Sequence, residues 1–129
     1  FHRAFDVAAD PFGALETLIK LGVDRVLTSG QEATALEGLP LIAELIERAG
    51  DRIVIMPGGG ITARNVERIV TQARPSELHF AALEPTSSAM RFRRGHVFMG
   101  GELRPPEYDR LESSPAAIRA IVAKASGRR

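Results

Sequence analysis

The chain has 129 residues, of which 44% are hydrophobic and 26% are charged, so it is large and apolar enough for one globular domain. Its 17 basic and 16 acidic side chains nearly balance, which excludes nucleic acid or a membrane surface as the main partner on charge grounds. Cysteine is absent, which excludes disulfides and thiolate chemistry within the chain, and no apolar run is long enough to span a membrane.

The first predicted element is a strand at Phe1–Phe5, which the chain enters without any preceding turn. We therefore expect the chain to be a piece of a longer protein. Asp10 and Pro11 are typical of a helix start, and Gly22 follows the apolar stripe of that helix as a stop signal. A second strand is predicted at Arg25–Thr28.

A second helix is predicted from Pro40 to Gly50, followed by a strand at Ile53–Met56. This strand has no polar alternation, which is typical of a strand covered on both faces in a parallel sheet. Three glycines follow it, and Thr62 is the predicted cap of the third helix.

The last predicted strand is Leu78–Ala81, and the last helix begins at Ser114 and Pro115. Between them, residues 83–113 are expected to form an irregular loop, which is either a lid or binding loop or a flexible segment. Strands and helices alternate with about 25 to 29 residues from strand to strand, the period of a (β/α)8 barrel. The pattern predicts an α/β fold with four βα units of a TIM barrel, and a flavodoxin-like open sheet fits the same periodicity.

Ligands of parallel α/β folds lie at the C-terminal ends of the strands, so the predicted strand ends hold the candidate site residues. Gly58, Gly59 and Gly60 can adopt positive φ and let a ligand approach the backbone, and the predicted helix after them points its N-terminus at the same space. This arrangement suits an anion, most often a phosphate. A plain tight turn explains the glycines equally well, because no nucleotide-binding spacing is present.

His2 and Arg3 are adjacent in the first predicted strand and therefore point to opposite faces. One of them is expected to contact a substrate, and the alternative is that Arg3 pairs with a carboxylate such as Asp6 or Glu77. Asp6 itself is either a general base or a residue that caps the next segment.

The end of the second predicted strand offers hydroxyl and backbone donors for an anion or a sugar, or else forms an ordinary turn, at Thr28, Ser29 and Gly30. His79, near the end of the last predicted strand, is a candidate ligand-binding residue or a core histidine. The two lysines lie outside the strand ends, so imine chemistry is not supported. The spacing of the candidate soft-metal ligands matches no strong motif, so no metal site is assigned to Met90, His96 and Met99.

Six short blocks occur together along the chain: FHRAFD at 1–6, RVLTSGQ at 25–31, GGGI at 58–61 with Asn65 after it, ELH at 77–79, SAMRFR at 88–93 and EYDR at 107–110. Together they resemble the C-terminal half of the CutC family, starting within its fifth barrel strand. The resemblance implies a (β/α)8 barrel of about 250 residues, of which this chain supplies about the last four βα units. It also implies a cytoplasmic protein, often a dimer or higher oligomer, that is named for copper homeostasis.

In the register implied by this resemblance, Gly58–Gly60 follow barrel strand seven and His79 ends strand eight, where barrels commonly bind phosphate. The family has two serines after this histidine, whereas this chain has Phe80 and Ala81, so two hydroxyl donors are replaced by an apolar wall. Copper(I) prefers sulfur ligands. Copper is therefore expected as a cofactor only because of the resemblance. Any cysteine ligands of the family would have to lie outside this segment.

Two functional hypotheses follow. The first is a CutC-like protein of copper homeostasis whose molecular activity is undefined. The second is a TIM-barrel enzyme acting on a small anionic or phosphorylated metabolite, held at Gly58–Gly60 with Arg3 and Ser29, while His2 or Asp6 moves a proton. A half-barrel leaves unpaired strand edges, so the expected partner is the N-terminal half-barrel or a second copy, in a homo-oligomer.

Overall fold

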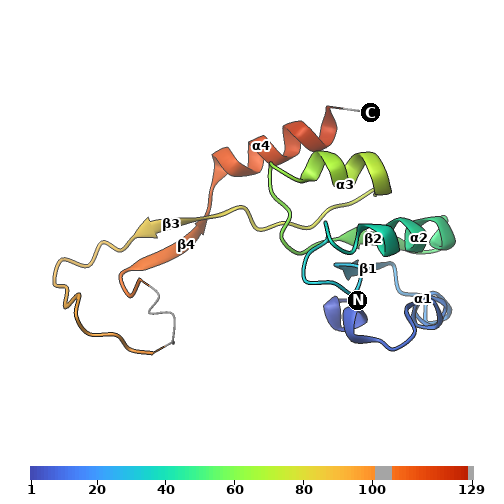
Figure 1. Ribbon diagram of the computed structural model, residues 1–129, viewed down its shortest axis with the longest axis horizontal. Helices are drawn as coiled ribbons and strands as arrows, with labels where there is room; N and C mark the ends of the chain where they lie inside the picture. Colours follow the sequence, from blue (N-terminus) through green and yellow to red (C-terminus); the bar gives the residue numbers. More distant parts are fainter. Residues whose placement is uncertain (101–105, 128–129) are drawn as a thin grey trace.

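The computed structural model describes residues 1–100 and 106–127, and these form a mixed α/β structure. The elements follow in the order η1 (Arg3–Val7), α1 (Pro11–Lys20), β1 (Arg25–Thr28), α2 (Leu39–Ala49), β2 (Val54–Pro57), α3 (Val66–Ala73), β3 (Leu83–Ser87), β4 (Asp109–Ser113) and α4 (Pro115–Ser126). Figure 1 shows a body that ends with α4 beside α3, and a ribbon of β3 and β4 that extends to one side. The predicted mixed α/β class is confirmed.

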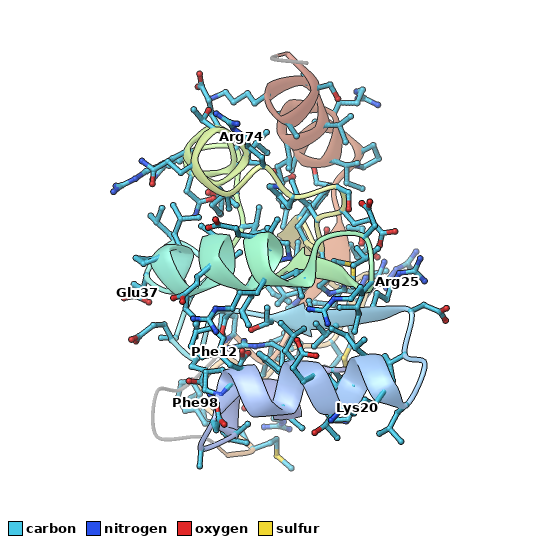
Figure 2. The ribbon with its side chains drawn as sticks, turned by 90° about the vertical axis from the view of Figure 1, so that its right-hand side faces the viewer. Phe12, Lys20, Arg25, Glu37, Arg74 and Phe98 are labelled. Carbon is cyan, nitrogen blue, oxygen red and sulfur yellow. The ribbon has the colours of Figure 1, made fainter. Side chains whose placement is uncertain are left out.

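The body is built on a two-stranded parallel sheet, in which β1 pairs with β2 from Arg25↔Val54 to Thr28↔Pro57. The helices α1 and α2 cover one face of this sheet (Figures 1 and 2). Val26 and Ile55 point to that face and are buried with residues of both helices. Because side chains alternate along a strand, Leu27 and Met56 point to the other face, where they are only half-buried. That second face is the one that a closed barrel would enclose.

The expected helix starts are confirmed where a local cap is present. Asp10 accepts hydrogen bonds from the backbone N–H groups of Phe12 and Gly13, both at 3.0 Å, at the start of α1. Ser114 accepts a hydrogen bond from Ala117 N at 3.2 Å at the start of α4. A short polar side chain before a proline therefore predicted these helices correctly, because the cap and the helix are neighbours in sequence.

The predicted strand at Phe1–Phe5 is wrong beyond its first residue. The Phe1 amine donates to the Arg25 carbonyl at 2.6 Å, and the Phe1 carbonyl accepts from Leu27 N at 2.9 Å, so Phe1 lies alongside β1. The backbone then turns into the 3-10 helix η1, which His2 caps. Phe5 is only 1% exposed and packs in the core with residues of α1. The apolar side chain is therefore buried from a helical turn, without an extended strand.

The predicted strand at Leu78–Ala81 is also wrong, since it is reduced to one parallel bridge between Gly58 and His79. His79 N donates to the Pro57 carbonyl at 2.9 Å, and no further ladder is formed among the described residues of this segment. The described part of the chain therefore has two parallel strands with one bridge beside them. The barrel remains an expectation for a longer chain.

The third helix begins later than the cap predicted at Thr62. The Asn65 side chain accepts from Thr62 N and donates to the Gly60 carbonyl, both at 2.8 Å, and so holds residues 60–65 in a turn. α3 starts only after this turn, at Val66. Its N-terminus is therefore separated from the glycines by the Asn65 turn, and a contribution of its dipole to an anion site at the glycines stays a prediction.

Residues 83–113 were expected to be irregular, but both ends of this segment pair as the antiparallel strands β3 and β4. The ribbon is amphipathic, because Leu83 and Pro85 share one face with Leu111 while Glu84 and Glu112 share the other. All five β4 residues are exposed. The alternation of apolar and polar residues in these short strands is hard to recognise in the sequence, because the strands also contain proline and serine, which are typical of loops.

Candidate functional site

The site is built around Asp6, a side chain that lies at the C-terminal end of β1. Its carboxylate accepts hydrogen bonds from Thr28 Oγ1, from Ser29 N at 3.0 Å, from Ser29 Oγ at 2.9 Å and from Gln31 N at 3.2 Å. It also forms an ion pair with Arg3, whose Nε lies 2.7 Å from Oδ2. One carboxylate thus joins η1 to the start of the loop that follows β1.

These contacts change the acidity of Asp6. Burial by itself raises the pKa of the Asp6 carboxyl, but hydrogen bonds from Arg3, Thr28 and Ser29 outweigh burial and lower the pKa to about 2. Asp6 is therefore a firmly held anion near neutral pH, with little tendency to take up a proton. The predicted role of Asp6 as general base stays a prediction, while its contacts are those of a residue that positions its neighbours.

Arg3 is the neighbour that Asp6 positions most directly. Besides the ion pair, Arg3 Nη2 donates to Ser29 Oγ at 2.5 Å and to the Glu32 carbonyl at 3.3 Å. The third nitrogen, Nη1, lies against Gly59, where an added Cβ would be 3.2 Å from it. Hydrogen bonds thus hold the Nε and Nη2 atoms of the guanidinium, and its Nη1 atom faces the glycine turn.

The loop after β1 depends on a close backbone approach between Gly30 and Gly38. A Cβ on Gly38 would lie 1.9 Å from the Ser29 carbonyl oxygen, and one on Gly30 would lie 2.3 Å from the Gly38 carbonyl oxygen. Gln31 adopts φ 61, and its side chain donates to the Ala8 carbonyl at 2.5 Å. Sequence reasoning missed Gly38 and Gln31, because neither contact is between sequence neighbours.

The glycine turn after β2 has the positive φ values that were expected, 109 at Gly59 and 67 at Gly60. Gly58 N donates to the Thr28 carbonyl at 2.9 Å, and the Gly59 carbonyl accepts from Ala35 N at 2.9 Å. The N–H groups of Gly59 and Gly60 have no acceptor among the described residues, and Gly59 is the glycine that lies against the Arg3 guanidinium.

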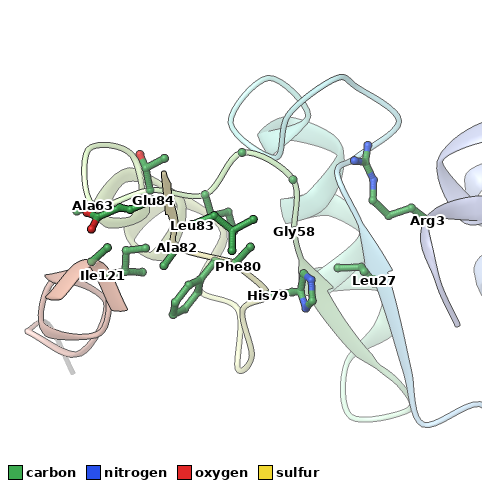
Figure 3. Close-up of a pocket in the computed structure, with 16 residues that line it drawn as sticks. Arg3, Leu27, Gly58, Ala63, His79, Phe80, Ala82, Leu83, Glu84 and Ile121 are labelled. Atoms are coloured by element: carbon green, nitrogen blue, oxygen red, sulfur yellow. The ribbon is translucent and has the colours of Figure 1, made fainter. Parts of the chain in front are cut away.

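A cavity of about 490 Å³ opens at this turn (Figure 3). Its lining includes Arg3, the three glycines and His79. The rest of the lining is mainly apolar, and comprises Leu27, Ile61, Thr62, Ala63, Phe80, Ala81, Ala82, Leu83, Glu84, Ala117 and Ile121. The cavity therefore combines a small set of donors with a large apolar wall.

The predicted site residues fall into three groups. The lining of the cavity contains Arg3, Gly58, Gly59, Gly60 and His79. Thr28, Ser29 and Gly30 lie behind Arg3, where Thr28 and Ser29 are fully buried and hydrogen-bonded to Asp6. His2 is outside the described lining: its Nδ1 accepts from Ala4 N at 3.0 Å and its ring stacks on Phe1. The roles assigned to all of these residues stay predictions.

The available donors do not fit a closed copper site. The chain has no cysteine, and no group of three or more His, Asp or Glu residues that could hold a metal occurs in the described part. Met90, His96 and Met99 are exposed on the ribbon and its connection, and Met99 is 82% exposed. Copper(I) prefers sulfur ligands, and no copper site is assigned to the described residues. Within the described residues, no helix is long and apolar enough to cross a membrane.

Comparisons with known proteins give a consistent result. The model of the CutC family matches residues 1–84. A human protein named "Copper homeostasis protein cutC homolog" is 50% identical over 121 residues, which cover 94% of this chain and 44% of that protein. A "family protein CutC" from Parabacteroides distasonis is 44% identical, over 94% of this chain and 50% of its own length.

A crystal structure of CutC from Streptococcus agalactiae superposes with a TM-score of 0.57 at 36% identity, covering 61% of this chain and 40% of that chain. The chain thus spans about half the length of the curated relatives it matches.

Proposed function

The chain belongs to the CutC family, and on this premise we propose that it is part of a protein of copper homeostasis, the role stated in the name of its human relative. We further propose that it supplies about the last four βα units of a TIM barrel. The half-covered sheet face and the lone bridge at His79 support this proposal, because both are completed when further strands close the sheet. We propose no copper ligand among the described residues.

For the site itself we propose the binding of a small anion at the glycine turn. The observation that carries the proposal is Arg3, held by Asp6 and Ser29 with its free edge against Gly59. A guanidinium that the fold already holds in place, beside free backbone N–H groups, can bind an anion without losing further side-chain entropy. An enzyme that acts on such an anion is the alternative, and it requires a proton-transfer group, for which the described lining offers His79 and Glu84.

The anion proposal is tested with inorganic phosphate, titrated into the chain and followed by calorimetry. Replacing Arg3 by Ala is expected to weaken phosphate binding at least about tenfold, because the charge-assisted hydrogen bonds are lost. Arg25→Ala is the matched control, because Arg25, at the start of β1, is also an exposed arginine that pairs with a carboxylate, that of Glu77. Equal phosphate affinity in the Arg3→Ala variant, or no binding to the unaltered chain, would contradict the proposal.

We also propose that the isolated chain associates, with a second copy replacing the other half-barrel. The exposed part of the sheet face at Leu27 and Met56 supports this. Sedimentation is expected to show species heavier than 14.0 kDa, the mass of the chain. Met56→Glu should shift the population to monomer, whereas Met99→Glu on the exposed connection should not. A compact monomer for the unaltered chain would defeat the proposal.

A further inference from the structure

The size of the cavity sets the kind of anion that it takes. A single water occupies about 30 Å³ in the liquid, so a bare phosphate fills only a minor part of 490 Å³. Cavities of about 300 to 1,000 Å³ are typical of sites for organic ligands. The volume therefore leaves room for a ligand body attached to the anionic group.

The end of the cavity that lies farthest from Arg3 is apolar. Figure 3 shows Arg3 at one end with Leu27 and His79 beside it, Ala82 and Ile121 at the other end, and Leu83 between them. Phe80 packs against the buried cluster that includes Ile121, so this wall is held in place by the core. Leu83 is 48% exposed, and a ligand body that covered it would remove apolar surface from water.

The apolar end also carries a negative charge. Glu84 also lines the cavity; it follows Leu83 in β3 on the other face of the ribbon, where it lies directly across from Glu112. Glu112 is paired with Arg110, and no cation is paired with Glu84 among the described residues. A second anionic group on the ligand would be repelled at this end.

We infer that the cavity binds an organic monophosphate or monocarboxylate whose body is apolar and carries no second anionic group. This inference rests on the proposed anion site and adds the chemical class of its ligand. The anionic head lies at Arg3 and the glycine turn, and the body lies along Phe80 and Leu83. Leu83 and Glu84 are the residues that determine specificity.

The test compares inorganic phosphate, phenyl phosphate and 4-carboxyphenyl phosphate by calorimetry on the full chain. Phenyl phosphate is expected to bind at least about tenfold more tightly than inorganic phosphate, and the added carboxylate is expected to cancel this gain. Leu83→Ser should reduce the gain from the ring without changing the affinity for inorganic phosphate. Leu111→Ser, at an exposed leucine of β4 outside the described lining, is the control. Glu84→Gln should restore the binding of 4-carboxyphenyl phosphate.

The outcomes separate the two proposals. Binding of inorganic and phenyl phosphate with equal affinity would overturn the apolar-body inference and leave the anion site standing. A ring-dependent gain that persists in both Leu83→Ser and Phe80→Ala would also overturn it, because the ring would then lie elsewhere. If neither phosphate binds to the unaltered chain, the anion site and the inference fail together.

Discussion

Replacing Asp6 by Ala is expected to lower the free energy of unfolding by about 3 kcal/mol. The substitution leaves the fully buried Thr28 hydroxyl and the buried Ser29 N–H without their acceptor, and it removes the partner of the Arg3 guanidinium. Unsatisfied buried donors cost their full desolvation penalty, which is larger than the net value of a hydrogen bond. Urea unfolding measures the change through the transition midpoint.

Asp10→Ala is the matched control for this substitution. Asp10 also accepts two backbone hydrogen bonds, but it caps an exposed helix start. Its loss is expected to cost about 1 kcal/mol, the usual effect of removing an N-cap. An Asp6 substitution that costs no more than the Asp10 substitution would show that the Asp6 contacts are not coupled to folding.

The same carboxylate makes the stability of the chain depend on pH. The folded-state pKa of Asp6 lies at about 2, below its ordinary value of 3.8. The folded state therefore binds the Asp6 proton less readily than the unfolded state, and stability is fully present above the ordinary value and is lost as the pH falls through about 2. With solvent screening at the half-exposed Arg3, this contribution is about 1–2 kcal/mol. It is measured as the stability difference between the unaltered chain and Asp6→Asn, which should shrink between pH 5 and pH 2.

The second large effect is expected at Gly38. A Cβ at this position would lie 1.9 Å from the Ser29 carbonyl oxygen and 2.8 Å from Gly30 Cα. Both contacts are to backbone, which cannot move aside without opening the loop that holds Ser29 in contact with Asp6. Gly38→Ala is therefore expected to destabilise the chain by about 3 kcal/mol or more, or to prevent folding.

Soluble yield and the urea midpoint measure the effect of Gly38→Ala. Gly95→Ala is the control, because a Cβ there meets no atom within 4 Å and the backbone has no positive φ. That control is expected to stay within about 0.5 kcal/mol of the unaltered chain. If the two variants unfold at the same urea concentration, the Gly30 and Gly38 approach does not limit the stability of this loop.

The sequence by itself determined the features whose cause is local. α1 and α4 begin at Asp10 and Ser114 because cap and helix are adjacent in the chain. β1 and β2 were predicted because each is a short apolar run that stays covered by helices. The membership in the CutC family was also determined at this level, because short motifs in a fixed order need no contacts to be recognised.

Only the tertiary structure decided the features that depend on residues far apart in the chain. Residues 3–7 form a helical turn that buries Phe5 in the core. Residues 78–81 form only one bridge, because no neighbouring strand extends their ladder. Asp6 had two local interpretations. Its pairing with Arg3, three residues away, was among the alternatives that the sequence offered, whereas its contacts with Thr28 and Ser29, more than twenty positions away, were not. Hydrogen-bond partners and close backbone approaches of this kind are set by the path of the whole chain, so no local pattern in the sequence contains them.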